Sequence, residues 1–267
     1  MLAPLPIVDT RPFFRPLFDE FGRLLATLPA DAWLRPTVAP RWRVRDVVAH
    51  MVDTGLRRLS FHRDRLPPPP ASGDLVEFIN RLNADFVAVS ARFSPPVLQS
   101  LHDRMASELS AFFADLPLDG PALFPVSWAG EHESLAWFDI GRDFTEYWHH
   151  QMQVRDAVGV GQASDPQWLH AVLNVALRAL PYQLRQITKP PGTVIQLEIS
   201  GASGGTWAMV RDQSGWTLHQ GHAGAAAVTL RMTDGALVKA LFNALPLTSA
   251  LAAADVAGDI TLAAACP

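Results

Sequence analysis

The spacing of apolar residues in this chain changes at Lys189-Pro190-Pro191-Gly192. Before this point, apolar residues recur every three or four positions over long windows, which is typical of amphipathic helices. After it, short apolar runs alternate with clusters of Gly, Asp and Ser, which is typical of strands and turns. Two adjacent prolines neither continue a helix nor donate to a sheet, so they favour a boundary. The sequence therefore predicts an α plus α+β fold, with a helical bundle over residues 1–190 and a small α+β domain over residues 191–267.

The first part is predicted to be helical, and four of its helices are expected to form the core of the bundle. The helical windows lie at residues 13–28, 44–65, 78–89, 97–113, 134–157 and 165–187. The run Pro67-Pro68-Pro69-Pro70 forces an extended connection after the second window, because proline lacks a backbone N–H and restricts the residue before it. Ser134 is predicted to cap the fifth helix, and Asp165 followed by Pro166 to start the sixth. Pro181 should kink or end that helix.

The second part is predicted to be mostly strands. Alternating or apolar runs with turn residues between them lie at residues 194–199, 207–210, 216–218 and 227–232. Thr233 and Asp234 then predict the start of a helix that reaches Phe242. Residues 256–263 indicate a turn into a last strand or helix.

Composition narrows the class of protein. The chain has 267 residues, of which 49% are hydrophobic and 18% charged, as in a globular protein with a sizeable core. Its net charge of -4 gives no basic surface, so nucleic acid is not an expected partner. No segment approaches the roughly 20 apolar residues of a membrane span, and the N-terminus lacks a signal-peptide pattern, so we expect a cytoplasmic protein without a membrane partner. A homodimer is compatible with this composition, although no motif fixes the oligomeric state.

Two segments suggest a metal site. Glu146 and His150 are four residues apart in a helical window, which places a carboxylate and an imidazole on one face about one turn apart. His50, in the second window, offers a third donor. Two His and one Glu are a ligand set of catalytic zinc sites, which leave a fourth position open. Gln153 continues the same stripe, and His149 lies about 100° round the helix as a candidate proton-transfer group.

Other interpretations of these residues stay open. A Glu/His pair at this spacing is also common on solvated helix faces, and the three residues could simply hydrogen-bond one another. A structural metal ion would be closed by a fourth protein ligand, whereas a catalytic one needs an open position. Gln153 or Thr54 could orient a ligand, or be an ordinary boundary residue. Arg155 could bind a substrate carboxylate, or form an ion pair with Asp156.

The same segments carry a family resemblance. They are Trp42-Arg43-Val44-Arg45-Asp46-Val47-Val48-Ala49-His50-Met51 and the stretch from Thr145 to Gly159. A Trp eight residues before a His, then Glu-x-x-x-His followed by Arg and Gly, resembles the mycothiol-dependent maleylpyruvate isomerase group of the DinB/YfiT-like metal-binding superfamily. Over residues 10–160 this resemblance implies a DinB-like helical bundle.

The resemblance also implies a ligand set and a partner domain. His50, Glu146 and His150 would hold a divalent metal, usually zinc, with nickel or manganese as alternatives. Many superfamily members carry three His, so Glu146 points to the isomerase-like branch, whereas Gln153 stands where the family pattern has an Asp. Residues 192–263 separately resemble a sterol-carrier-like (SCP2-like) α+β domain.

These features lead to one main hypothesis and two alternatives. The single cysteine, Cys266, excludes an internal disulfide and a cysteine-based zinc site within one chain, so a thiol enzyme would take its thiol from a cosubstrate. We expect a metal-dependent transferase or isomerase in which a low-molecular-weight thiol attacks a small electrophilic substrate, by S-transfer or cis–trans isomerisation. The same site could instead activate water for hydrolysis. In the second alternative the protein is not an enzyme but binds a small apolar ligand, with a structural metal.

Overall fold

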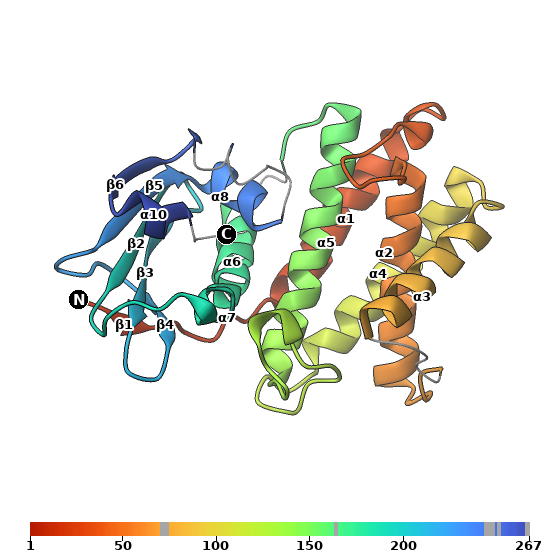
Figure 1. The fold of residues 1–267 in the computed structure, drawn as a ribbon. Coiled ribbons are helices and arrows are strands. Elements are labelled where there is room, and N and C mark those ends of the chain that lie inside the picture. Colours follow the sequence, from red (N-terminus) through yellow and green to blue (C-terminus); the bar gives the residue numbers. More distant parts are fainter. Residues whose placement is uncertain (70–74, 163–164, 243–248, 250–251, 265–267) are drawn as a thin grey trace. The chain divides into compact units, whose positions relative to one another are not determined.

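The computed structural model spans residues 1–267 and describes all of them except 70–74, 163–164, 243–248, 250–251 and 265–267. The chain forms two compact units (Figure 1). The bundle unit comprises Thr10–Pro117 and Glu146–Ser164, and the sheet unit comprises Met1–Asp9, Leu118–Thr145 and Asp165–Pro267. The domain boundary that the sequence places near residues 190 and 191 stays a prediction.

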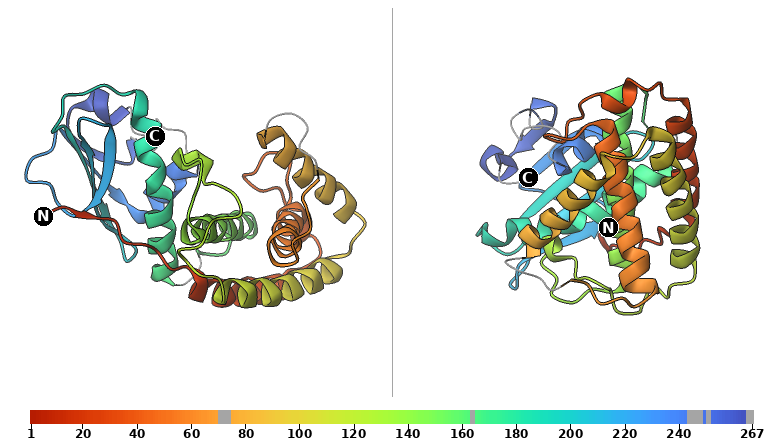
Figure 2. Two further views of the ribbon diagram at one scale, coloured as in Figure 1. Left: turned by 90° about the horizontal axis from the view of Figure 1, so that it is seen from below. Right: turned by 90° about the vertical axis from the view of Figure 1, so that its right-hand side faces the viewer.

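The bundle unit contains the predicted helices. They are α1 (Arg11–Thr27), α2 (Val44–Arg58), α3 (Leu75–Ser90), α4 (Pro95–Ala114) and the second half of α5 (Ala136–Val158), with a 3-10 turn, η1, at Ala32–Leu34. Helix α1 packs against α4, and α2 packs against both α3 and α4 (Figure 2). With the strands described below, these helices confirm the predicted fold class.

Aromatic and small residues set the helix spacing in this unit. The rings of Phe14 and Phe113 have their centroids 4.7 Å apart, and those of Phe18 and Tyr147 are 4.8 Å apart. All four side chains are almost completely buried. At Gly55 in α2, an added Cβ would lie 2.3 Å from Met105 Sδ, so the absence of a side chain lets α2 approach α4 closely.

The prolines after α2 act as expected. The helix continues as a π-helical turn, η2, at Leu59–Arg63 and then stops. Pro67, Pro68 and Pro69 follow without regular structure, and Pro70 lies outside the described residues. A segment predicted as one helix to about residue 65 therefore ends a few residues earlier, with a widened last turn.

Ser134 does not cap α5, contrary to the prediction. The helix begins at Ala136, and the Ser134 hydroxyl accepts a hydrogen bond from Val126 N (2.9 Å) and donates to Glu131. The loop before the helix, with a 3-10 turn (η3) at Ser127–Ala129, folds back on Ser134 and uses its hydroxyl. The hydroxyl is oriented toward the loop, and this contact takes the place of the local cap.

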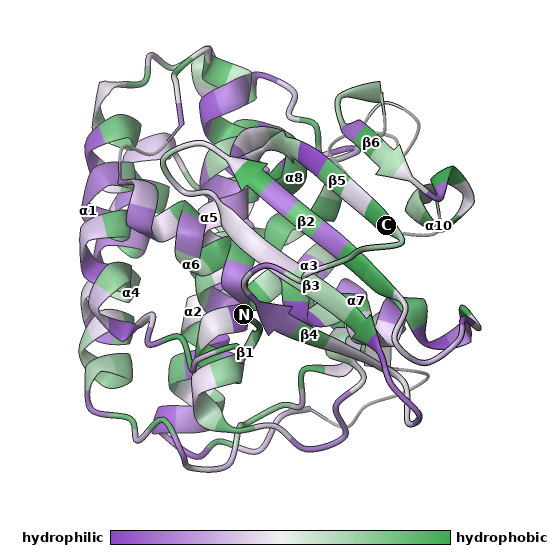
Figure 3. Ribbon diagram, turned by 90° about the vertical axis from the view of Figure 1, so that its left-hand side faces the viewer, coloured by the Kyte–Doolittle hydropathy of each residue, from purple (hydrophilic) through white to green (hydrophobic). Residues whose placement is uncertain are grey.

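The described residues of the sheet unit form six strands. They are β1 (Ala3–Pro4), β2 (Val194–Ser200), β3 (Gly205–Arg211), β4 (Trp216–Gln220), β5 (Val228–Thr233) and β6 (Asp255–Gly258). Their order is β1-β4-β3-β2-β5-β6, and all neighbours are antiparallel except β2 and β5 (Figure 3). Strand β1 was not predicted, because a two-residue Ala-Pro edge carries no strand pattern.

Helices cover one face of the sheet. Helix α6 (Pro166–Ala176) lies against it (Figure 1). Trp207 Nε1 on the sheet donates to Asn174 Oδ1 on this helix at 3.1 Å. Asp165 caps α6 as predicted, by accepting from Gln167 N at 2.8 Å. Near Pro181 the helical path breaks, as predicted, into the short turns η4 (Leu177–Ala179), α7 (Leu180–Gln183) and η5 (Leu184–Gln186).

The end of the chain contains both of the expected alternatives. Thr233 Oγ1 accepts from Ala236 N at 3.1 Å and caps α8 (Asp234–Leu241), as predicted. Strand β6 is followed by α10 (Ile260–Ala264), whereas Cys266 lies outside the described residues. The sterol-carrier-like character of this part stays a prediction. Among the described residues, no helix has the length and apolar content needed to cross a bilayer.

Candidate metal centre

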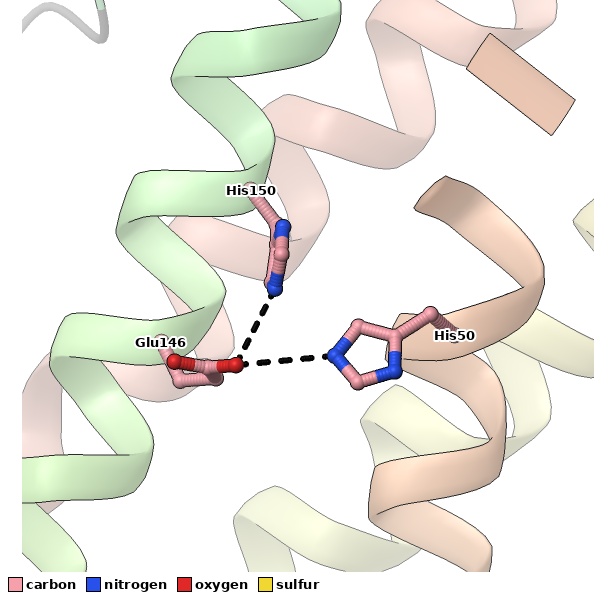
Figure 4. A group of neighbouring side chains, drawn as sticks. All are labelled: His50, Glu146 and His150. Atoms are coloured by element: carbon pink, nitrogen blue, oxygen red, sulfur yellow. Dashed lines mark hydrogen bonds and ion pairs between the residues drawn. The ribbon is translucent and has the colours of Figure 1, made fainter. Parts of the chain in front are cut away.

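His50, Glu146 and His150 meet inside the bundle unit. His150 Nε2 lies 3.0 Å from Glu146 Oε1, and His50 Nε2 lies 3.5 Å from the same oxygen (Figure 4). The donor atoms of the three residues all lie within 4.8 Å of one another. The three donors therefore converge on one point, from two helices that are far apart in the sequence.

The loop before α2 positions His50. Thr37 N and Thr37 Oγ1 both donate to Trp42 O, at 3.0 and 2.9 Å, and Arg43 pairs with Pro36 in a β-bridge. Arg43 N in turn donates to Asp46 Oδ2 at 2.9 Å, which fixes the first turn of α2. The start of α2 is thus held from both sides, and His50 follows two turns later on its buried face.

A neighbouring stripe of α5 makes the contacts that anchor Glu146 and His150. Gln151 Nε2 donates to Leu17 O on α1 at 3.1 Å, and the Tyr147 ring packs edge-on against Phe18. Because these contacts hold one face of the helix, residues 146 and 150 project from the neighbouring face, one turn apart. This is the local geometry that the i, i+4 spacing predicted.

The site is buried on its histidine side and open at the carboxylate. The side chains of His50 and His150 are 6% and 10% exposed, whereas that of Glu146 is 45% exposed. Burial lowers the pKa of His50, and the hydrogen bond with Glu146 offsets only part of this. Burial also opposes the charged form of His150, but the Glu146 carboxylate outweighs it and raises that pKa. Partial burial acts to raise the pKa of Glu146, yet the two imidazoles, His150 above all, hold it well below its usual range.

Gln153 joins the two adjacent histidines. His150 Nδ1 lies 2.8 Å from Gln153 Oε1, and Gln153 Nε2 lies 2.9 Å from His149 Nε2. The imidazole centroids of His149 and His150 are 5.5 Å apart. Burial, and next the neighbouring His150, lower the pKa of His149 to about 4. His149 is therefore neutral at physiological pH.

The three residues fit a small divalent cation. Ligands about 2.0–2.1 Å from a tetrahedral ion lie about 3.3 Å from each other, and the observed separations of 3.0 and 3.5 Å to Glu146 Oε1 bracket that value. Because an amide oxygen only accepts, His150 donates from Nδ1 to Gln153 Oε1, so the neutral ring would present the lone pair of Nε2 to a cation beside the carboxylate. Within the described part of the chain, no fourth His, Cys, Asp or Glu joins the group.

Comparison with known proteins places the chain in a family. The family described as "Mycothiol maleylpyruvate isomerase N-terminal domain" matches residues 14–155, which is more than half of the chain. The chain belongs to this family. The curated proteins Rv0036c and MT0041 of Mycobacterium tuberculosis, both uncharacterized, are each 28% identical to it over 211 residues, 76% of this chain and 78% of theirs. The crystal structure of the mycothiol-dependent maleylpyruvate isomerase superposes with a TM-score of 0.54 at 13% identity, over 89% of both chains.

These comparisons confirm the resemblance seen in the sequence. The solved isomerase, at this low identity, shows a shared fold, and membership of the maleylpyruvate isomerase family supports a thiol-dependent, isomerase-like function. The family match begins just after the start of α1 and ends at Arg155, so it covers all three residues of the candidate centre.

Trp42 lies at the site, although the sequence indicated it only as part of the family pattern and not as a site residue. Its ring centroid lies 4.8 Å from that of His50 and 6.1 Å from that of His150, and the two imidazoles stand nearly perpendicular, 4.7 Å apart. An aromatic face against two imidazoles fixes their orientation and favours any positive charge that they carry. Its place two residues before α2 was the available signal.

Two other predicted site residues make contacts that do not orient the three donors. The Thr54 hydroxyl donates to His50 O at 3.0 Å, within its own helix, and so satisfies the backbone and not an imidazole. Arg155 is buried, donates from Nη1 to Gly161 O at 2.9 Å and pairs with Glu20 of α1. Its ion pair is thus with Glu20, which is remote in sequence, and not with Asp156.

Proposed function

We propose that this protein is a metal-dependent enzyme that uses a low-molecular-weight thiol as nucleophile on a small electrophilic substrate. The observation that carries the proposal is the convergence of His50, Glu146 and His150 on one point, with Glu146 open to solvent. Three protein donors with one accessible side are the arrangement of catalytic zinc sites, whereas structural sites are closed by a fourth ligand. Membership of the maleylpyruvate isomerase family supports mycothiol as the first thiol to test.

The chain supplies binding and orientation for this chemistry. His50 and His150 would each offer an Nε2 lone pair, and Glu146 would offer a carboxylate oxygen. A bound divalent ion, zinc in the first instance, would lower the pKa of a thiol so that thiolate exists at neutral pH. Trp42 and the buried side of the bundle exclude water from the two imidazoles. The nucleophile would come from the cosubstrate, because the only cysteine is the near-terminal Cys266.

The proposed reaction is addition to a conjugated double bond. The thiolate electron pair forms a carbon–sulfur bond while the π pair moves to the conjugated carbonyl oxygen. Rotation about the new single bond, return of that electron pair and departure of the thiolate give the cis–trans isomer with no net redox change. If the adduct instead takes up a proton on carbon, the carbon–sulfur bond stays and the outcome is S-transfer.

Metal content of the purified, untagged protein tests the centre. We expect about one zinc ion per chain after loading and dialysis, as measured by plasma mass spectrometry. The variants His50→Ala and His150→Ala should each lose it. His222→Ala is the matched control, because His222 also contacts a glutamate, Glu198, but at an exposed position of the sheet unit. A wild-type protein that takes up no zinc, nickel or manganese would refute the metal centre.

Turnover tests the reaction. The zinc-loaded protein is mixed with an electrophilic cis-enone or cis-enoic acid and with mycothiol, bacillithiol or glutathione, and isomer and thioether products are separated by liquid chromatography. We expect product only with both zinc and a thiol. Product formed by hydrolysis of esters or amides without any thiol would show instead that the site activates water. Cytoplasmic location and a homodimeric state stay predictions, to be measured by fractionation and light scattering.

A further inference from the structure

We infer that Gln153 is a positioning residue that fixes the tautomers of His149 and His150 together. In this arrangement His150 carries its proton on Nδ1 and presents a lone pair on Nε2, while His149 also carries its proton on Nδ1. The inference rests on the proposed function, because it assigns how the chain prepares one metal ligand and the histidine next to it.

The two ends of the Gln153 carboxamide differ in what they can do in a hydrogen bond. Its oxygen only accepts hydrogen bonds and its nitrogen only donates them. Gln153 Oε1 lies 2.8 Å from His150 Nδ1, so this imidazole nitrogen is the donor. Gln153 Nε2 lies 2.9 Å from His149 Nε2, so that imidazole nitrogen is the acceptor. One planar group thus sets the proton position on both rings.

The opposite orientation of the amide would disable the ligand. If Nε2 of Gln153 faced His150, then Nδ1 of His150 would accept and its proton would move to Nε2, which points at Glu146. A protonated Nε2 cannot bind a metal ion. At the same time His149 would have to donate from Nε2 to the amide oxygen. The two tautomers are therefore linked, and only the orientation seen here leaves His150 able to act as a ligand.

This linkage assigns a chemical role to His149. With Nε2 occupied as an acceptor, the neutral ring has its proton on Nδ1 and offers an N–H rather than a lone pair. In this tautomer the ring is a hydrogen-bond donor at Nδ1. As long as Gln153 donates to His149 Nε2, this nitrogen cannot act as a general base.

A carboxylate at position 153 could not do the same. Aspartate or glutamate would still accept from His150 Nδ1 and would make that imidazole a more basic ligand. It could not donate to His149, however, and would instead force His149 to place its proton on Nε2. The matched substitutions are therefore Gln153→Glu, which keeps the acceptor and removes the donor, and Gln153→Met, which removes both. Gln167→Glu, at an exposed position of α6, is the control for the added charge.

Nitrogen–proton correlation spectra of the imidazole rings in the zinc-loaded protein test the inference, because they show which ring nitrogen carries the proton. In the wild-type protein and in Gln167→Glu we expect the proton on Nδ1 in both His149 and His150. In Gln153→Glu, His150 should be unchanged and the proton of His149 should move to Nε2. In Gln153→Met, zinc affinity should fall by about 10- to 100-fold.

The outcomes separate this inference from the proposed function. A wild-type protein that binds zinc but has the His149 proton on Nε2 would overturn the inference and leave the metal centre standing. The inference would also fail if the proton of His149 stays on Nδ1 in Gln153→Glu. A wild-type protein that binds no zinc would refute the metal centre itself. The metal analysis of the wild type and the single-histidine variants detects that outcome independently of the spectra. The wild-type spectrum alone is decisive if a variant does not fold.

Discussion

Glu146 meets two buried imidazoles in the bundle unit, whereas Glu198 meets His222 and Arg231 on the polar face of the sheet. Glu198 Oε1 lies 3.1 Å from His222 Nε2, and Glu198 Oε2 lies 2.6 Å from Arg231 Nε. The His222 and Arg231 side chains are 62% and 45% exposed, against 6% and 10% for the two histidines beside Glu146. Similar residue types thus occur in opposite environments.

The two carboxylates differ in the groups that neutralise their charge. The guanidinium of Arg231 compensates Glu198, and solvent screens both groups, so this cluster needs no ion. For Glu146 the structure shows two imidazoles: burial makes His50 less basic, whereas the carboxylate raises the pKa of His150, so any positive charge beside Glu146 comes from rings that can also bind a metal ion. The two clusters therefore differ in the burial of the histidines beside Glu146 and in the guanidinium beside Glu198.

Elsewhere the bundle unit buries its charges in compensated pairs, and the largest expected effect comes from breaking one. Arg155 and Glu20 are 7% and 16% exposed, so Arg155→Met removes a buried cation and should cost about 3–5 kcal/mol in the free energy of unfolding. The matched Arg231→Met in the sheet unit should cost less than about 1 kcal/mol. Urea unfolding of both variants measures this. Equal losses would show that the two units do not differ in how they treat charge.

A second buried pair should make stability depend on pH. Burial raises the pKa of Asp53 to about 6, and Arg57, whose guanidinium lies 2.9 Å away, offsets only part of that. The unfolded value is about 3.9, so the folded state binds more protons between pH 4 and pH 6. The contribution of Asp53 is therefore present below about pH 4 and is lost as pH rises through about 6, by up to about 3 kcal/mol.

The variant Asp53→Asn isolates this contribution. Urea unfolding gives the free energy of unfolding of both proteins at about pH 4 and about pH 7. From the lower to the higher pH, the wild-type value should fall relative to that of Asp53→Asn. Arg57 keeps a partner in the variant, because it also donates to Asn83 Oδ1 at 2.6 Å. Asp255→Asn, at an exposed ion pair of the sheet unit, is the control and should shift stability by less than about 0.5 kcal/mol. A pH-independent difference between wild type and Asp53→Asn would contradict the burial argument.

Zinc should stabilise the protein through the candidate centre alone. At a free zinc concentration about 100 times the dissociation constant, binding to the folded state adds about 2.7 kcal/mol, which raises Tm by about 5–10 °C. This zinc-dependent shift should vanish in His50→Ala and persist in His222→Ala. Calorimetry with and without a chelator measures it. If His222→Ala removes the zinc-dependent shift in Tm, zinc binds in the sheet unit and not at the candidate centre.

The smallest effect expected is on affinity when the carboxylate is neutralised. Glu146→Gln keeps the shape of the side chain but replaces an anionic ligand by a neutral one, so zinc should bind at least about tenfold more weakly, or about 1.4 kcal/mol. Glu198→Gln should leave affinity unchanged. Competition with a chromophoric chelator gives both values. Unchanged affinity in Glu146→Gln would reduce the ligand set to the two histidines.

Local chemistry made much of the fold predictable. Helical periodicity placed α1 to α6, and the caps predicted at Asp165 and Thr233 were correct. These features depend on neighbours within a few residues. The role of Ser134 was predicted wrongly and β1 was not predicted at all. Their partners, Val126 in a folded-back loop and His219 and Gln220 on β4, are chosen by tertiary contact.

The candidate site divides in the same way. The sequence by itself determined that Glu146, His150 and Gln153 share one stripe, because the period of 3.6 residues per turn fixes that spacing in any helix. Only the tertiary structure decided that His50, 96 residues before Glu146, faces the same oxygen, that Trp42 covers both imidazoles, and that Arg155 pairs with Glu20. Helix packing sets such contacts through burial and close fit over the whole core, and no short spacing in the chain encodes them.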